Sequence, residues 1–197
     1  MPLTKQTPSV SAGRAGKPAT RRAVLGGVVT GAAMLMLPGR AVAAPAEWRL
    51  ALRNIHTGET VDALFARSGQ FLPQGLAELA HGMRDWRTGE AFAMDRQLLA
   101  LLVNLRQTLG QPGNKAFDLI SGYRSPATNG ALKAAGGAHS GVASKSQHML
   151  GKASDIHLPG IALDRLRSAA MALGRGGVGY YPKDGFVHVD TGRVRHW

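Results

Sequence analysis

Two histidines and one aspartate have the spacing of a metal site. His148 and Asp155 lie seven residues apart in the segment SQHMLGKASD, and Gly151 between them allows the chain to turn sharply. That turn can bring a loop histidine beside an aspartate on the strand that follows. His188 belongs to a later segment, FVHVD, whose alternating pattern predicts a strand with His188 and Asp190 on the same face.

Two imidazoles and one carboxylate form the ligand set of an open catalytic zinc site, in which water takes the fourth position. Zinc lowers the pKa of that water towards neutrality and polarises a carbonyl group, so this ligand set favours hydrolysis. The residues alone leave an alternative open, in which His148 is an ordinary loop histidine and His188 a packed strand histidine. The chain contains no cysteine, which excludes disulfides, thiolate zinc sites and cysteine nucleophiles.

The elements that must position these residues follow from hydrophobic periodicity and turn signals. Asp95 can cap a leucine-rich helix that Gly110 ends. Helices lead and strands cluster late, which predicts an α+β fold with a mostly antiparallel sheet flanked by helices. We expect strands at 48–53, 61–66, 117–121, 153–158, 177–181 and 186–190, and helices at 73–84, 95–109, 126–135 and 163–173.

Residues 1–43 are predicted to be an export signal. They carry six of the 24 basic residues and none of the 12 acidic ones. Arg21 and Arg22 precede an uncharged run shorter than the roughly 20 residues of a membrane span, and the sequence AVA ending at Ala43 provides a cleavage site. The segment resembles a twin-arginine signal, which implies an export machinery as its partner and a periplasmic domain at 44–197. An uncleaved inner-membrane anchor is the alternative.

The part of the chain after the signal has a modest net charge. It holds 18 basic and 12 acidic residues, which gives a formal charge of +6. It shows neither a patch of aromatic and basic residues nor a nucleic-acid-binding motif, so we expect no nucleic-acid partner. Its length suits one domain with a core of its own.

Three sequence blocks resemble those of the M15-type zinc peptidases. Ser146, His148, Gly151, Ala153 and Asp155 match every fixed position of the family motif S-x-H-x-x-G-x-A-x-D. The earlier segment SGYRSP resembles a second block, and GVGYYP followed by FVHVD resembles the closing block. The resemblance covers nearly the whole chain after the signal. It is strongest for the branch known as DUF882, which includes a periplasmic murein endopeptidase of enterobacteria, and it implies a Hedgehog/DD-peptidase-like zinc peptidase fold.

The resemblance also implies roles for individual residues. It makes His148, Asp155 and His188 the ligands of one zinc ion per chain. It places a substrate-binding arginine at Arg124, whose planar guanidinium suits a carboxylate or carbonyl group, and it adds Ser146 to the substrate site. A structural ion pair with an acidic neighbour is the alternative for Arg124.

The general base is where this sequence departs from the family. Many relatives have a glutamate three residues before the last histidine ligand, and this chain has Gly185 there. Asp190 is the favoured substitute because it shares the strand face of that ligand, although it could instead orient the ligand. Asp184 is the second candidate, in a turn where aspartate is common for conformational reasons. His139 and His157 are candidate auxiliary groups for stabilising an oxyanion.

The expected function is that of a zinc-dependent peptidoglycan endopeptidase. It would hydrolyse D-Ala–diaminopimelate cross-links, diaminopimelate–diaminopimelate cross-links, or both, between peptidoglycan stem peptides. The alternative is a non-catalytic peptidoglycan-binding or scaffolding protein that retains the fold, which the missing glutamate favours. No S-x-x-K motif occurs, so serine acyl-enzyme chemistry of the penicillin-binding type is not expected.

Replacing both Arg21 and Arg22 with lysine should trap the precursor in the cytoplasm, because a twin-arginine signal requires the arginine pair and not merely its charge. Fractionation of producing cells followed by immunoblotting measures the exported share, and Arg14→Lys serves as the control. Unimpaired export of the double variant would contradict the twin-arginine assignment, though not secretion by another route.

Overall fold

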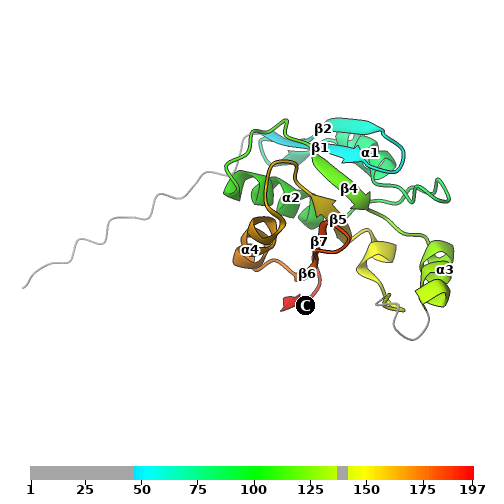
Figure 1. The fold of residues 1–197 in the computed structure, drawn as a ribbon. Coiled ribbons are helices and arrows are strands. Elements are labelled where there is room, and N and C mark those ends of the chain that lie inside the picture. Colours follow the sequence, from blue (N-terminus) through cyan, green and yellow to red (C-terminus); the bar gives the residue numbers. More distant parts are fainter. Residues whose placement is uncertain (1–46, 137–141) are drawn as a thin grey trace, which may run out of the picture. The chain divides into compact units, whose positions relative to one another are not determined.

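A mixed sheet of eight strands forms the framework of this computed structural model, which describes residues 47–136 and 142–197 (Figure 1). The strand order is β3-β2-β1-β4-β5-β7-β6-β8. β1 pairs with β4 and β6 with β8 in parallel, whereas the other five neighbouring pairs are antiparallel. The strands are β1 (Glu47–Asn54), β2 (Thr60–Arg67), β3 (Gln70–Phe71), β4 (Phe117–Ser121), β5 (Ala153–His157), β6 (Gly177–Tyr181), β7 (Phe186–Asp190) and β8 (Arg195–His196).

All six expected strands are present in the sheet. The connections between them decide whether neighbouring strands run parallel or antiparallel. β1 and β2 form the expected antiparallel hairpin. β1 and β4 run parallel because two helices intervene in the chain, and such a crossover returns the strand in the same direction. The edge strands β3 and β8 were not expected, since two residues carry no periodic pattern.

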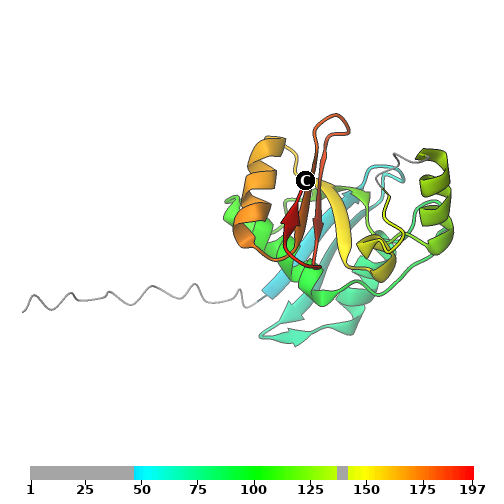
Figure 2. The ribbon, with the colours of Figure 1, turned by 90° about the horizontal axis from the view of Figure 1, so that it is seen from below.

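All four expected helices are present as well, and α2 supplies much of the core. Asp95 caps it by accepting a hydrogen bond from the backbone N–H of Gln97 at 2.8 Å. Its fully buried leucines each contribute about 2 kcal/mol by leaving water. α3 and α4 lie on opposite sides of β5, β7 and β6 (Figure 2). The helices are α1 (Pro73–Gly82), α2 (Arg96–Thr108), α3 (Pro126–Gly136), α4 (Leu163–Leu173) and the short 3₁₀ helix η2 (Gln147–Leu150).

The central strands and the turn before β5 bring the candidate ligands together. β5 and β7 pair so that Asp155 lies directly opposite His188. η2 precedes β5 and ends at Gly151, whose φ of 64° is left-handed. A Cβ atom at Gly151 would lie 2.5 Å from the carbonyl oxygen of Ala93, so only glycine fits this close turn.

The predicted export signal at residues 1–43 and the candidate residue His139 lie outside the described residues. Within 47–136 and 142–197, no helix is both long and apolar enough to cross a bilayer. The choice between a cleaved signal and an anchor therefore stays a prediction from sequence.

Asp95→Ala should destabilise the protein by more than the roughly 1 kcal/mol that losing a helix N-cap usually costs. The effect should exceed that of a simple cap, because the second carboxylate oxygen of Asp95 accepts a hydrogen bond from the Thr191 hydroxyl at 2.8 Å. Urea unfolding measures the change, and Gln97→Ala, which keeps the backbone donor, is the control. Equal stability of the two variants would show that the cap contributes nothing.

Candidate metal centre

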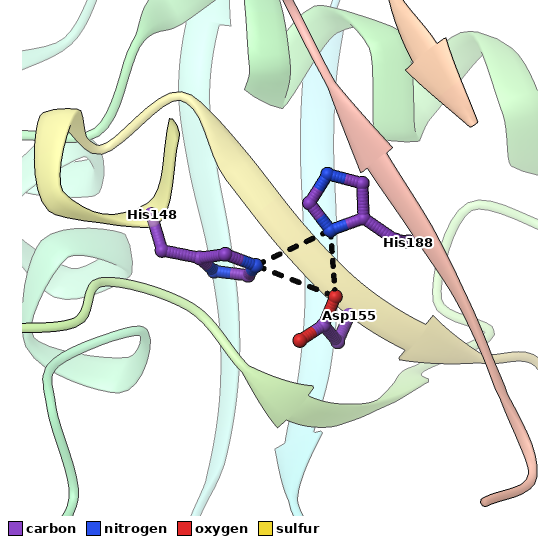
Figure 3. A group of neighbouring side chains, drawn as sticks. All are labelled: His148, Asp155 and His188. Atoms are coloured by element: carbon purple, nitrogen blue, oxygen red, sulfur yellow. Dashed lines mark hydrogen bonds and ion pairs between the residues drawn. The ribbon is translucent and has the colours of Figure 1, made fainter. Parts of the chain in front are cut away.

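Three candidate ligand atoms from separate segments converge beside the middle residues of β5 and β7. Nε2 of His148 lies 3.2 Å from Nδ1 of His188 and 3.4 Å from Oδ1 of Asp155. Nδ1 of His188 lies 2.8 Å from the same Oδ1 atom. All three side chains are buried, and they point towards one another (Figure 3). They are the three residues within the described ranges that could share one metal ion.

Hydrogen bonds on the outer sides of both rings fit a metal between them. Nδ1 of His148 donates to the carbonyl oxygen of Gly122 at 2.7 Å, and Nε2 of His188 donates to Oδ2 of Asp190 at 3.0 Å. A neutral ring that keeps its outer bond carries its proton on the outer nitrogen, because these oxygens only accept. A protonated His188 donates to Asp155 as well. When both rings are neutral, the inner nitrogens direct lone pairs at each other and at the carboxylate. A cation relieves that repulsion, so the residues fit a bound metal.

The charge balance of the centre also favours a cation. Burial alone would raise the pKa of Asp155, but the facing rings of His148 and His188 outweigh it and hold that pKa well below its usual range. Burial would lower the pKa of His188, but hydrogen bonds to Asp155 and Asp190 outweigh it and raise that pKa. Surroundings that favour a proton on an imidazole also favour a metal ion, which competes with that proton.

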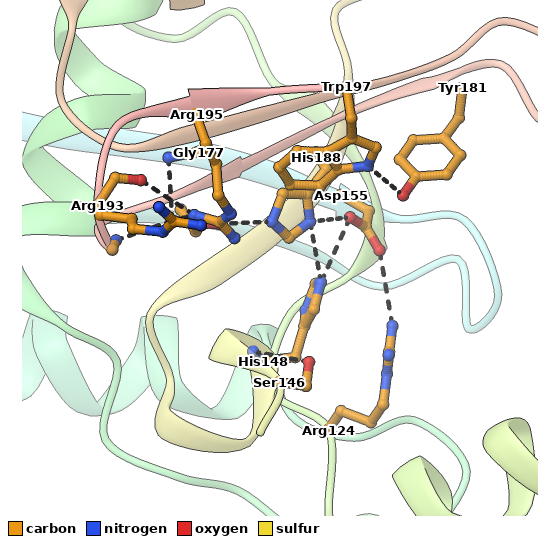
Figure 4. A network of polar contacts seen from close by, with 12 residues as sticks. Arg124, Ser146, His148, Asp155, Gly177, Tyr181, His188, Arg193, Arg195 and Trp197 are labelled. Atoms are coloured by element: carbon orange, nitrogen blue, oxygen red, sulfur yellow. Dashed lines mark hydrogen bonds and ion pairs between the residues drawn. The ribbon is translucent and has the colours of Figure 1, made fainter. Parts of the chain in front are cut away.

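Asp190 is fully buried and saturated with donors (Figure 4). Besides His188, it accepts hydrogen bonds from the backbone N–H groups of Gly177 and Gly192 at 3.0 and 2.8 Å. Arg195 adds two more, at 3.1 and 2.7 Å. Burial would raise the pKa of Asp190, but the bonds from His188 and Arg195 outweigh it and keep the carboxylate ionised.

These contacts weigh against Asp190 as the general base, a role that stays a prediction from the sequence. A carboxylate offers about four lone-pair positions, and five donors already occupy those of Asp190. Asp190 is also absent from the lining of the cleft beside the centre. Its contacts favour the alternative role, in which Asp190 orients the ring of His188. The other candidate base, Asp184, is exposed and does line that cleft.

The cleft beside the metal centre has a volume of about 290 Å³. All three candidate ligands line it, so a group bound there reaches the converging lone pairs. Its other described lining residues are Arg124, Val142, Ala143, Lys145, Ser146, Gln147, Tyr181, Asp184, Phe186, Arg195 and Trp197.

Arg124 stands beside Asp155 with donors to spare. Its Nη2 atom lies 3.7 Å from Oδ2 of Asp155, which is an ion pair but too long for a hydrogen bond. Its Nε–H is buried without a hydrogen-bond partner among the described residues. Burial lowers the pKa of Arg124, and the charge of Asp155 opposes that effect. The ion pair expected as the alternative is therefore present, and it leaves the guanidinium able to bind a further acceptor.

The other candidate residues differ in their placement. Ser146 lines the cleft and also caps η2, since its hydroxyl accepts a hydrogen bond from the backbone N–H of His148 at 3.3 Å. His157 does not reach the cleft and lies 3.5 Å from Asp118 instead. It stands two residues beyond Asp155 along β5, about 7 Å further from the centre. This placement does not favour an auxiliary role for His157, which stays a prediction from the sequence.

Asp85, in the loop after α1, is a buried support that was not expected from the sequence. Its two carboxylate oxygens accept hydrogen bonds from the backbone N–H groups of Arg87 and Ser125 at 3.1 and 2.9 Å. The backbone N–H of Tyr123 donates to the carbonyl oxygen of Met83 at 2.7 Å. These bonds attach the segment that holds Arg124 to the loop. The sequence signal at this place is an ordinary turn pattern, which hides the role.

Tyr123 attaches the same segment a second time. Its hydroxyl donates to Oε1 of Glu90 at 2.8 Å, and its ring stacks on Phe92 with 4.9 Å between centroids. Burial, together with the bond to Glu90, raises the pKa of Tyr123 to about 12, so the hydroxyl remains a donor over the whole physiological range.

Asp85→Asn should lower the free energy of unfolding by about 2 kcal/mol near neutral pH, because an amide nitrogen replaces one acceptor of a backbone N–H. Burial would raise the pKa of Asp85, but hydrogen bonds from Thr128 and Ser125 outweigh it and hold the pKa below its usual 3.8. The contribution of Asp85 is thus complete above about pH 4 and is lost as the pH falls through the lower folded-state pKa. The stability gap between parent and variant should therefore narrow in acid.

Chemical unfolding at several pH values measures that gap, and Glu78→Gln, on the exposed side of α1, is the control. A gap that stays constant down to strong acid would show that the charge of Asp85 is not what stabilises the loop.

The chain is similar to known proteins and matches one family model. Residues 42–197 match the family model described as peptidoglycan L,D-endopeptidase MepK. The chain is 45% identical to peptidoglycan L,D-endopeptidase MepK of Escherichia coli K12, over 88% of this chain and 93% of that protein. It is 40% identical to a probable peptidoglycan L,D-endopeptidase MepK of Haemophilus influenzae, over 88% and 91%. No solved structure matches the chain. The chain therefore belongs to the M15-type peptidase family described as peptidoglycan L,D-endopeptidase MepK.

Proposed function

We propose that this protein is a zinc-dependent peptidoglycan endopeptidase that hydrolyses peptide cross-links between stem peptides. The observation that carries the proposal is the convergence of two imidazole nitrogens and one carboxylate oxygen in a cleft of a peptidase-family chain. Two nitrogens and one oxygen are a ligand set that suits zinc. The same family also supports a Hedgehog/DD-peptidase-like fold for the domain.

The names of the relatives favour one of the two expected cross-links. Both relatives are named L,D-endopeptidases. A D-Ala–diaminopimelate cross-link joins two D-centres, whereas a diaminopimelate–diaminopimelate cross-link joins an L-centre to a D-centre. We therefore assign the diaminopimelate–diaminopimelate bond as the substrate of this chain.

The chemistry divides between a bound zinc ion and the protein's own groups. A zinc ion held by His148, Asp155 and His188 would supply an acidified water molecule and a Lewis acid for the scissile carbonyl. Asp190 fixes the ring of His188, so that its Nδ1 lone pair faces the centre. Gly122 fixes His148 in the same way through its carbonyl oxygen. The protein thus presents its ligands in one preset orientation.

Two further groups would act on the substrate. Arg124 has an unpartnered Nε–H and stands next to Asp155, so we assign it a carboxylate or carbonyl group of the stem peptide. Asp184 lines the cleft and is exposed, so we propose that it takes the proton from the attacking water. Gly185 stands where many relatives have that acid, and Asp184 is its immediate neighbour.

Export to the periplasm is part of the same proposal. The arginine pair and the AVA sequence support it, and peptidoglycan lies in that compartment. A basic domain also suits an anionic wall polymer.

A non-catalytic wall-binding protein is the second candidate function. The observation that favours it is Gly185, because an acid is missing where many relatives have the general base. Against it stands the preset ligand cluster, since a binding protein needs no open metal site. Hydrolysis of purified muropeptides separates the two functions.

His148→Ala and His188→Ala should each lose zinc and abolish cleavage of a diaminopimelate–diaminopimelate cross-linked muropeptide, because two remaining ligands hold the metal too weakly. Asp155→Ala should behave in the same way, and a chelator should reproduce the defect reversibly in the parent. Elemental analysis and chromatography of digested muropeptides measure both effects. His81→Ala, an exposed histidine on α1, is the matched control.

Zinc content and muropeptide cleavage also distinguish the general base Asp184 from the ligand Asp155. Asp184→Asn should keep zinc and lose at least about a hundredfold in kcat, the usual contribution of a general base. A His188→Ala protein with a full zinc equivalent and normal cleavage would refute the ligand assignment. A parent protein that keeps zinc but cleaves no cross-link would favour the wall-binding alternative.

A further inference from the structure

Trp197 forms part of the wall of the cleft beside the metal centre. Its indole ring lies 5.3 Å from the ring of His188, centroid to centroid, at an angle of 46°. The residue lines the cleft, and 47% of its surface is exposed. Figure 4 shows the indole next to His188 and extending towards Tyr181. A large aromatic side chain therefore stands half in solvent beside a candidate ligand.

Contacts with four residues of β6 fix Trp197 in place. The indole N–H donates to the hydroxyl of Tyr181 at 2.7 Å. Backbone hydrogen bonds join Trp197 to β6, from its N–H to the oxygen of Val178 at 3.2 Å and from the N–H of Tyr180 to its oxygen at 3.0 Å. The ring covers Gly179, where a Cβ atom would lie 2.7 Å from the indole. A side chain at that position would displace the ring from the wall.

The neighbours of Trp197 extend the surface into an aromatic wall, which we define as Tyr181, Phe186 and Trp197. Tyr181 and Phe186 stack with 4.6 Å between centroids, and both line the cleft. The guanidinium of Arg195 lies 4.9 Å from the centre of the Trp197 ring and bonds to Asp190 as well. The wall is thus attached to the group that orients His188.

An exposed but immobilised aromatic ring is suited to binding. Its apolar surface stays in contact with water, which costs free energy that a bound apolar group would recover. Its conformational entropy has already been lost in folding, so binding does not lose it again. Tryptophan is also among the residues that contribute most to binding when fixed in a partly enclosed site.

We infer that Trp197 is the surface on which the aliphatic part of the substrate packs, which holds the scissile bond next to His188. This inference rests on the proposed function, because it takes its ligand from it. Within the cross-link, each diaminopimelate carries an aliphatic chain between an L-end joined to the stem peptide and a D-end that keeps a free carboxylate. Arg124 lines the same cleft and its guanidinium suits the carboxylate, whereas the aromatic wall suits the chain.

The test compares kinetic constants of Trp197→Ala and Trp197→Phe on a diaminopimelate–diaminopimelate cross-linked muropeptide. Trp197→Ala should raise KM roughly tenfold, as expected for a central aromatic contact, and change kcat much less. Trp197→Phe should lie between Trp197→Ala and the parent, because it keeps an aromatic face but loses the bond to Tyr181. Val194→Ala, an exposed neighbour outside the cleft lining, should match the parent.

Two measurements distinguish substrate contact from a structural role. Zinc content should equal that of the parent in every variant. Tryptophan emission should change when the muropeptide is added to zinc-depleted parent protein. This change should disappear in Trp197→Phe, which keeps Trp48 and Trp86, neither of which lines the cleft.

The outcomes separate the inference from the proposed function. An unchanged KM in Trp197→Ala, or a fall in kcat alone, would overturn the inference while leaving the endopeptidase function intact. Zinc loss in Trp197→Ala would do the same, since it would make the wall a support of the metal centre. If Trp197→Ala does not fold, the KM and emission of Trp197→Phe decide in its place. A parent inactive on every cross-link would overturn the proposed function itself, and the inference with it.

Discussion

The site depends on the direct pairing of Asp155 with His188 across β5 and β7. That pairing places the two side chains side by side, with a carboxylate oxygen and an imidazole nitrogen 2.8 Å apart. A register shift of one residue would move one of them to the other face of the sheet. Fully buried valines on both sides of His188 resist such a shift, because it would expose them. Burial of the valines in the hydrophobic core therefore keeps Asp155 and His188 paired.

The third ligand comes from outside the sheet and needs separate supports. His148 sits on η2, whose ends are fixed by the Ser146 cap and the left-handed turn at Gly151. Its ring donates a hydrogen bond to the carbonyl oxygen of Gly122. The segment that contains Gly122 is attached through Asp85 to the loop after α1. The supports form a chain of buried hydrogen bonds. Each bond is strong because water does not compete for it.

The two sides of the candidate metal centre differ. The polar groups on the inner side are fully hydrogen-bonded, whereas the other side faces the cleft. On the inner side, Asp190 binds His188 and Arg195 and has no lone pair to spare. On the cleft side, Arg124 lines the wall, Asp184 is exposed, and 47% of the surface of Trp197 is exposed. Orientation and substrate contact are thus assigned to different groups, which agrees with a peptidase of the family to which the chain belongs.

The sequence by itself predicted the main strands and helices, the family, and the candidate ligands that the fold brings together. These predictions depend on local periodicity and on fixed spacings around His148 and Asp155. It did not determine which acid faces the cleft. Asp190 and His188 share a strand face, but only the fold surrounds Asp190 with five donors. Asp85 and Trp197 were likewise hidden, since their partners lie far away in the chain. Such roles arise from packing between distant segments, which tertiary structure alone decides.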